Sequence, residues 1–227
     1  MHFIKKQLSL PRTKRLLLLG ILFWVPIIIF SKLSEEVLER EPIAVDIAIL
    51  QSLRSISNPQ LDALFLFITE LGGTLFIILA GALLIGALFL NGHKRSALAV
   101  LFSVGGAGLI NMILKLSFQR VRPDLWTPII FEKAYSFPSG HAMGSSALAL
   151  SVIILLWRTK WRYLALIIGS IYVVLIGTSR VYLGVHYPSD VIGGWCISLV
   201  WVLIVRTTLK KFELRGKGVN ATNRASM

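Results

Sequence analysis

The sequence predicts an all-α integral membrane protein: six transmembrane helices in a bundle, with an interfacial amphipathic helix and both termini in the cytoplasm. Its 227 residues are 55% hydrophobic and 15% charged, with a mean hydropathy of +0.74, a composition outside the range of ordinary soluble domains. Six apolar runs are each long enough to cross about 30 Å of hydrocarbon. Basic residues gather in alternate segments between these runs, as expected for a multi-pass protein.

The first predicted span covers residues 16–33 and follows a basic segment, residues 1–15. This start resembles a signal peptide, but no small-x-small cleavage pattern follows Phe30, so we expect the span to be retained. The second span could begin earlier than its window, because residues 61–69 are also largely apolar. The remaining apolar windows fall at 72–91, 96–117, 141–157, 163–179 and 189–206.

An amphipathic helix is predicted between the first two spans. Its apolar side chains recur at helical spacing, at Ile43, Ile47, Leu50, Leu53 and Ile56. Polar residues, Asp46 and Arg54 among them, are expected on the opposite face. The helix either lies in the interface over the mouth of the bundle or is a packed connector with no part in substrate access.

The predicted loops divide the charged residues unequally between the two sides of the membrane. One side holds 16 of the 24 basic residues: five in the N-terminal segment, two at Lys94, three at Arg158 and six from Arg206 onward. Of the 11 acidic residues, only Glu213 falls on that side. Because Lys and Arg are retained in the cytoplasm, this side is predicted to be cytoplasmic and the long loops external.

A single membrane domain, residues 16–210, is predicted between the basic segment 1–15 and a basic cytoplasmic tail, residues 211–227. The net charge of +13 does not indicate nucleic-acid binding, because the basic residues sit at the ends of apolar runs. The one cysteine, Cys196, can form no intramolecular disulfide. Glycines of the apolar runs, including Gly105, Gly106 and Gly194, are expected to let helices approach closely.

Three short segments carry the candidate chemistry, and all fall at external helix ends within residues 115–190. Lys115 is followed after six residues by Arg122-Pro123. Pro138-Ser139-Gly140-His141 opens the fourth span, and Ser179-Arg180, then His186, then Asp190 connect the fifth and sixth spans. At one membrane depth this places three cations, two histidines, one carboxylate and a glycine-bearing helix start, which together indicate an oxyanion site.

Each residue type in this set suits phosphate chemistry. An arginine fork binds two phosphate oxygens at once, and lysine adds a compact charge. The backbone N–H groups of Ser139, Gly140 and His141 are expected to be unpaired at a helix start and to point at an anion.

The two histidines are expected to divide the work of phosphoryl transfer. His186 is the stronger candidate for nucleophile, since Asp190 could hold one of its ring nitrogens and leave the other free to attack. His141 would protonate the departing alcohol and later activate water.

In this order, Lys-x6-Arg-Pro, Pro-Ser-Gly-His and Ser-Arg-x5-His-x3-Asp resemble the three signature motifs of the type 2 phosphatidic acid phosphatase family, which also includes vanadium haloperoxidases. The resemblance implies a six-helix core, no metal or other cofactor, a transiently phosphorylated His186, an orienting Asp190 and an acid at His141. It also implies a phosphate-binding set of Lys115, Arg122, Ser139, Gly140 and Arg180. The motifs cover about a third of the chain.

The leading hypothesis is hydrolysis of the phosphomonoester or pyrophosphate of a lipid on the external face of the plasma or inner membrane. Phosphatidic acid, which would give diacylglycerol and phosphate, is the first candidate substrate. Undecaprenyl pyrophosphate is the close alternative, as for the bacterial phosphatidylglycerophosphate and undecaprenyl pyrophosphate phosphatases that the chain resembles. The motifs grip phosphate and not the lipid, so they leave this choice open.

Two further functions use the same charged residues. A phosphotransferase would pass the phosphoryl group to an acceptor other than water. A transporter would use them as an ion path, but the charges cluster at one face of the bundle. Residues 117–137, long for a connector, are expected to roof the site.

Overall fold

The computed structural model describes residues 12–40 and 43–225, and within them it contains eight α-helices and no strand. The all-α class is confirmed. Most of the segment 1–15 and the end of the tail 211–227 lie outside the described residues. The helices are α1 (Arg12–Leu38), α2 (Ala44–Ser55), α3 (Pro59–Glu70), α4 (Thr74–Leu90), α5 (Lys94–Phe118), α6 (Gly140–Leu156), α7 (Arg162–Tyr182) and α8 (Pro188–Ala225).

Several of the described helices are long and apolar enough to cross a membrane. Four qualify by length and composition: Leu16–Leu38 of α1, α5, α7, and Pro188–Leu209 of α8. The pair α3 and α4, bent by 43°, could form a fifth span. Large apolar side chains cover the outer faces, with Leu83 75% exposed and Leu17 66% exposed, as expected where hydrocarbon and not water is the neighbour. The chain is therefore a multi-pass membrane protein.

The predicted second span, 72–91, corresponds to α4, but the apolar run before it forms a separate helix. Asn58 caps α3 by accepting a hydrogen bond from the Leu61 N–H at 3.0 Å, and Pro59 suits the first helical position. The break between the two helices falls at Gly72 and Gly73. A Cβ at Gly72 would lie 2.4 Å from the Ile176 side chain, so the break packs directly on α7.

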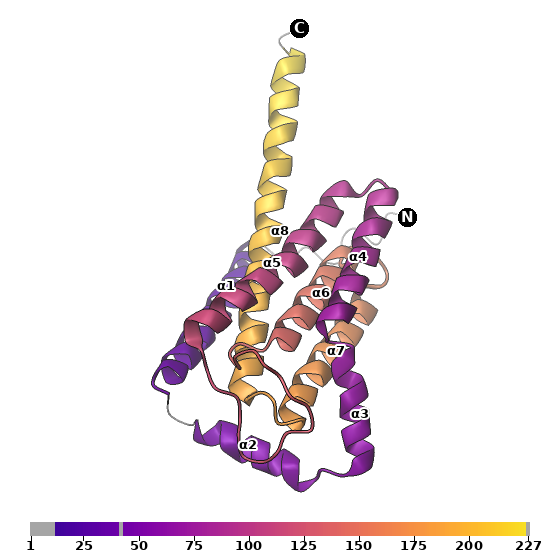
Figure 1. Ribbon diagram of the computed structural model, residues 1–227. Coiled ribbons are helices and arrows are strands. Elements are labelled where there is room, and N and C mark those ends of the chain that lie inside the picture. Colours follow the sequence, from indigo (N-terminus) through magenta and orange to yellow (C-terminus); the bar gives the residue numbers. More distant parts are fainter. Residues whose placement is uncertain (1–11, 41–42, 226–227) are drawn as a thin grey trace.

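Helix α6 is the centre of the bundle and contacts α4, α5, α7 and α8 (Figure 1). Its buried positions are mostly small or hydroxylated residues, which allow close helix packing. They include Ala142, Ser145, Ser146, Ala147, Ala149 and Ser151. In Figure 1, α1 begins and α8 ends on the same side of the bundle, and α8 extends past the predicted end of the sixth span.

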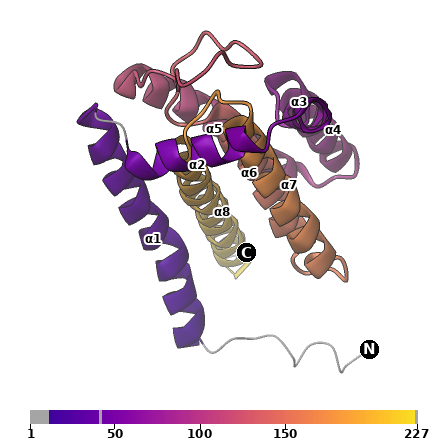
Figure 2. The same ribbon diagram turned by 90° about the horizontal axis from the view of Figure 1, so that it is seen from below.

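Helix α2 lies across one end of the bundle (Figure 2) and packs against α7 and α8. Leu50 is fully buried there, as its place in the apolar stripe predicts. Asp46 was expected on the outer face, and this expectation is wrong: its side chain is buried on the same inward face, one turn before Leu50. Asp46 turns inward because it accepts hydrogen bonds there, from Ser189 of α8 and from Arg120 in the segment after α5.

The expected close approach of helices at glycines holds at some positions only. A Cβ at Gly106 would lie 2.5 Å from Trp201, and one at Gly194 would lie 2.9 Å from the Ser139 carbonyl oxygen. At Gly105 no atom lies within 4 Å of the Cβ position, so that glycine serves no close contact.

Replacing Gly194 by alanine is therefore expected to destabilise the protein and lower its activity. The added methyl group meets backbone, which cannot rotate away, and overpacking of this kind costs about 1–3 kcal/mol. Thermal unfolding in detergent measures the effect. Gly105→Ala is the matched control and should unfold at the wild-type temperature or above, since alanine favours a helix over glycine. Equal unfolding temperatures for the two variants would contradict the packing argument.

Candidate active site

The eight predicted site residues lie at helix ends on the side of the bundle that α2 covers. The close of α5, the opening of α6, the close of α7 and the opening of α8 meet there, joined by the segment 119–139. Lys115 is in the last turn of α5, Arg122 follows it, Ser139 caps α6 with Gly140 and His141 behind it, Arg180 is in the last turn of α7, and His186 and Asp190 flank the start of α8.

His186 and Asp190 form a buried pair, 1% and 0% exposed. The His186 Nδ1 atom lies 3.2 Å from Asp190 Oδ2, and the same oxygen accepts the Tyr187 N–H at 2.8 Å and the Ser136 hydroxyl. With an acceptor at Nδ1, the tautomer that fits carries its proton there and leaves Nε2 unprotonated. Burial lowers the pKa of His186 well below its usual value, which keeps the imidazole neutral and nucleophilic.

Arg122 lies directly at the free nitrogen of that imidazole. Its Nη1 atom is 3.1 Å from His186 Nε2 and donates to the Val185 carbonyl at 2.6 Å. Its Nε donates to the Ala134 carbonyl at 2.8 Å, so backbone contacts on two sides hold the guanidinium in place. Lys115 reaches the same segment and donates to the Tyr135 carbonyl. Arg122 thus lies at His186 Nε2, and Lys115 contacts the segment that also holds Arg122.

Arg180 is the most buried cation of the site, at 1% exposure. It donates to Thr69 Oγ1 at 2.7 Å and to Glu132 Oε1 at 2.5 Å, while its Nε has no hydrogen-bond partner within the described residues. Burial would raise the pKa of Glu132, but Arg180 and Arg122 outweigh it and hold that pKa below its usual value. A buried guanidinium with a spare donor and a bound carboxylate is suited to bind oxyanions.

The start of α6 differs in one respect from the expectation. Ser139 caps the helix by accepting the Ala142 N–H at 3.4 Å, but its own N–H donates to the Asp190 carbonyl at 3.0 Å. The expectation of an unpaired Ser139 N–H is therefore wrong, because the turn is tied to α8. The N–H groups of Gly140 and His141 have no partner among the described residues. A Cβ at Gly140 would lie 3.0 Å from Asn111 Oδ1, so a larger residue would require that side chain to move.

His141 lies in the first turn of α6. Its imidazole makes no hydrogen bond within the described part of the chain that would give it a structural role. It lies in the electrostatic field of Arg180, Glu132 and Arg122. An imidazole without a hydrogen-bonding partner, beside two guanidinium groups and a carboxylate, can exchange a proton with a substrate oxygen.

Sequence reasoning missed three residues that shape the site: Arg120, Glu132 and Ser136. Arg120 contacts Asp190, Glu132 binds Arg180, and Ser136 lies between His186 and Asp190. All three belong to the segment that was predicted to roof the site. A signal existed for Arg120 and Ser136, since each is two residues from a motif residue, but only the folded segment reveals their partners.

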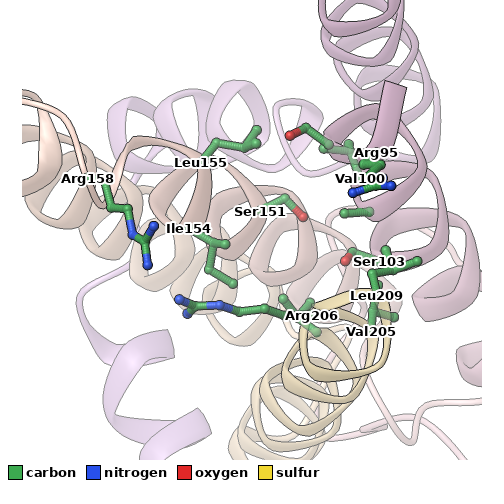
Figure 3. A pocket seen from close by; sticks show the side chains of 13 residues that line it. Arg95, Val100, Ser103, Ser151, Ile154, Leu155, Arg158, Val205, Arg206 and Leu209 are labelled. Atoms are coloured by element: carbon green, nitrogen blue, oxygen red, sulfur yellow. The ribbon is translucent and has the colours of Figure 1, made fainter. Parts of the chain in front are cut away.

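Metal-ligand clusters and cavities are the other features that could mark a functional site. Among the described residues, no group of three or more His, Cys, Asp or Glu side chains could hold a metal ion. A cavity of about 370 Å³ opens between α5, α6 and α8, where Arg95, Arg158 and Arg206 line it (Figure 3). It contains none of the predicted site residues, and its lining on α5, from Ser103 to Arg95, lies about 18 to 30 Å from Lys115 along that helix.

Comparison with known proteins finds a family model and relatives that match this chain. The model of the PAP2 superfamily matches residues 96–213. Phosphatidylglycerophosphatase B of Bacillus subtilis is 32% identical over 168 residues, which cover 72% of this chain and 82% of the relative. Undecaprenyl-diphosphatase BcrC of Bacillus subtilis is 35% identical over 150 residues, or 63% of this chain and 72% of the relative.

A solved structure also matches over nearly its whole length. The crystal structure of a transmembrane PAP2 type phosphatidylglycerolphosphate phosphatase from Bacillus subtilis superposes with a TM-score of 0.73 at 31% identity. The match covers 84% of this chain and 97% of that chain.

Proposed function

Because the chain belongs to the PAP2 superfamily, we propose that it is a membrane lipid-phosphate phosphatase that works through a phosphohistidine intermediate at His186. The observation that carries the proposal is the buried His186–Asp190 pair, with its free nitrogen facing a guanidinium. Phosphatidic acid remains a candidate substrate. The names of the relatives add phosphatidylglycerophosphate and undecaprenyl diphosphate as candidates of the same chemistry.

In the first step, His186 Nε2 attacks phosphorus and the bond from phosphorus to the leaving oxygen breaks. Arg122, Arg180 and Lys115 would balance the negative charge on the phosphoryl oxygens, together with the N–H groups of Gly140 and His141. The imidazolium formed at His186 is stabilised by Asp190 through Nδ1. His141 donates its proton to the leaving oxygen, giving the free alcohol or, from a diphosphate, the lipid monophosphate.

In the second step, water attacks the phosphohistidine and His141 takes a proton from that water. The bond from nitrogen to phosphorus breaks, inorganic phosphate leaves, and His186 returns to its starting form. Each turnover thus consumes one water molecule and releases one phosphate. No metal or other cofactor has a step in this sequence.

A phosphate-release panel tests the substrate class. It compares phosphatidic acid, lysophosphatidic acid, phosphatidylglycerophosphate, diacylglycerol pyrophosphate and undecaprenyl diphosphate in detergent with excess EDTA. Release from at least one substrate, unchanged by the chelator, is expected. Release from none would overturn the proposal. Loss of release in EDTA that Zn²⁺ or Mg²⁺ restores would show that a metal takes part.

We also propose six spans, with both termini in the cytoplasm and the site on the external face of the plasma or inner membrane. The asymmetric distribution of basic residues supports this orientation. Helix α6 would be the fourth span, short because it opens inside the site, and α3 with α4 would form the second. A lipid phosphate could then keep its chains in the bilayer while its headgroup enters from the side that α2 covers.

Cysteine labelling tests the sidedness. In a background with Cys196 replaced, a cysteine at exposed Thr127 should react with a membrane-impermeant maleimide in intact cells. A cysteine at exposed Thr159, in the turn between α6 and α7, should react only after permeabilisation. The reverse pattern would invert the proposed orientation.

A further inference from the structure

Arg120 connects the site to helix α2 through both branches of its guanidinium. The Nη1 atom donates to Asp190 Oδ1 at 2.6 Å and to Ser189 Oγ at 2.7 Å. The Nη2 atom donates to Asp46 Oδ2 at 3.0 Å. The guanidinium also lies over the Tyr187 ring, 4.1 Å from its centroid. With a side chain only 10% exposed, Arg120 is held on three sides.

Asp190 is bound at both of its oxygens as a result. Oδ2 accepts hydrogen bonds from His186, Tyr187 and Ser136, and Oδ1 accepts one from Arg120. A carboxylate with one oxygen free can turn about its last bond, and the imidazole that it holds can then turn with it. With both oxygens bound, the carboxylate is fixed, and so is the direction of His186 Nε2. Outer contacts of this kind orient the group that reacts.

Asp46 extends this chain of contacts to α2. Its side chain is 2% exposed, and it accepts the Ser189 N–H at 2.9 Å, the Ser189 hydroxyl and the Arg120 guanidinium. A buried carboxylate is tolerated only when it is fully paired. Arg120 therefore stands between two buried carboxylates, one from α2 and one beside the nucleophile. Among the described residues it is the cation paired with Asp46 and the hydrogen-bonding partner of Asp190 Oδ1.

We propose that Arg120 is a positioning residue for the nucleophile, and that α2 acts through Asp46 to hold Arg120 against Asp190. The proposal rests on the phosphohistidine function given above. On this proposal, His186 keeps its orientation only while α2 is packed against α8. An interfacial helix thereby takes part in the chemistry without touching the reacting atoms.

The test compares Arg120→Gln, Arg120→Lys and Asp46→Asn with wild type, using the best substrate of the panel. Arg120→Gln should lower kcat about 10- to 100-fold, the usual effect of losing such an outer contact, with KM changed less than threefold. Arg120→Lys should recover part of the rate because the charge remains. Lys133→Gln removes the same charge from an exposed position in the same segment and should match wild type.

The pH profile separates positioning from mere stability. At His186, Asp190 and Ser136 face Nδ1, Arg122 faces Nε2, and Arg180 adds its charge from α7. Without Arg120 a nearby positive charge is lost, and Asp190 interacts more strongly with a protonated imidazole. The acid limb of kcat/KM should therefore move to higher pH in Arg120→Gln. Asp46→Asn keeps the positive charge of Arg120, so its acid limb should move less.

The outcomes distinguish the two proposals. If wild type is active and Arg120→Gln keeps its kcat, or loses rate with an unmoved acid limb, the positioning role is wrong and the phosphatase stands. The effects of Arg120→Gln and Asp46→Asn should also be less than additive in the double variant, since both act through one contact chain. Full additivity would contradict the link to α2. A wild type that releases no phosphate would overturn both proposals.

Discussion

His186→Ala is expected to abolish phosphate release, with a loss of roughly a thousandfold or more, because the variant lacks the atom that attacks phosphorus. No other imidazole can substitute in this geometry, since the partners that hold Nδ1 are built around position 186. The loss is measured as the rate of phosphate release by equal amounts of purified, folded wild-type and variant protein in detergent. A rapid-quench experiment with substrate labelled in its phosphoryl group adds the direct readout: label bound to wild-type protein and absent from the variant.

The control for this prediction is His93→Ala. His93 is exposed in the turn between α4 and α5, at the opposite end of the bundle, and should be silent. His186→Gln guards against a folding artefact, since it refills the buried space and should be equally inactive. A His186→Ala protein that unfolds like wild type and still releases phosphate at a similar rate would remove His186 from the mechanism.

His141→Ala is expected to lower release from a lipid phosphate about 10²- to 10⁴-fold, the range for a general acid and base. The loss should depend on the leaving group. From an activated aryl phosphate such as 4-nitrophenyl phosphate, the phenolate leaves without taking up a proton, so the first step needs little help from His141. Attack by water on the phosphohistidine still needs a base. The labelled phosphoenzyme should therefore accumulate in His141→Ala with an aryl phosphate.

That accumulation distinguishes proton transfer from phosphate binding at His141. If His141 only bound the phosphoryl group, the variant would release phosphate from the lipid and aryl phosphates with equal losses of rate, and no phosphoenzyme would accumulate. A loss equal for lipid and aryl phosphates would assign the acid to another residue. Ser139→Ala removes a helix cap beside His141. It is expected to lower the stability of the protein and to leave the dependence of the rate on the leaving group nearly unchanged.

The sequence was sufficient for the features that depend on local pattern. Apolar runs located the starts of α1 and of α4 to α8 to within four residues, because any segment that faces hydrocarbon must satisfy its backbone internally. The ends of α1 and α8 lie farther along the chain than predicted. The spacing from His186 to Asp190 was informative for a similar reason. Four residues at the start of a helix bring the carboxylate back to the imidazole.

Features that depend on a fold between distant residues could not be found this way. Asp46 was placed outward because its neighbours define an apolar stripe, and nothing near it in sequence reveals Arg120, its partner 74 residues away. Arg120 and Glu132 lie in a connector without helical or strand periodicity. Their partners on α7 and α8 become apparent only once that connector has folded over the helix ends.

The Ser139 N–H illustrates the same limit at the scale of one bond. A helix start predicts unpaired donors, but it does not say which of them another element will use. Here the Asp190 carbonyl uses the first one, and Gly140 and His141 keep theirs. Close packing at Gly194, whose Cβ position faces the Ser139 carbonyl oxygen, is what brings α8 near enough.

The ion pair between Arg180 and Glu132 gives the site a counter-ion of its own. In the proposed mechanism, an incoming phosphoryl group would therefore displace the Glu132 carboxylate from Arg180, where an unpaired cation would require no displacement. Such an exchange would lower the affinity for every anion by the same factor. Weakly bound monovalent anions would then not displace Glu132, whereas a dianion held by several donors would still bind. The exchange also returns a carboxylate to Arg180 as free phosphate departs, which favours release of the product over inhibition by it.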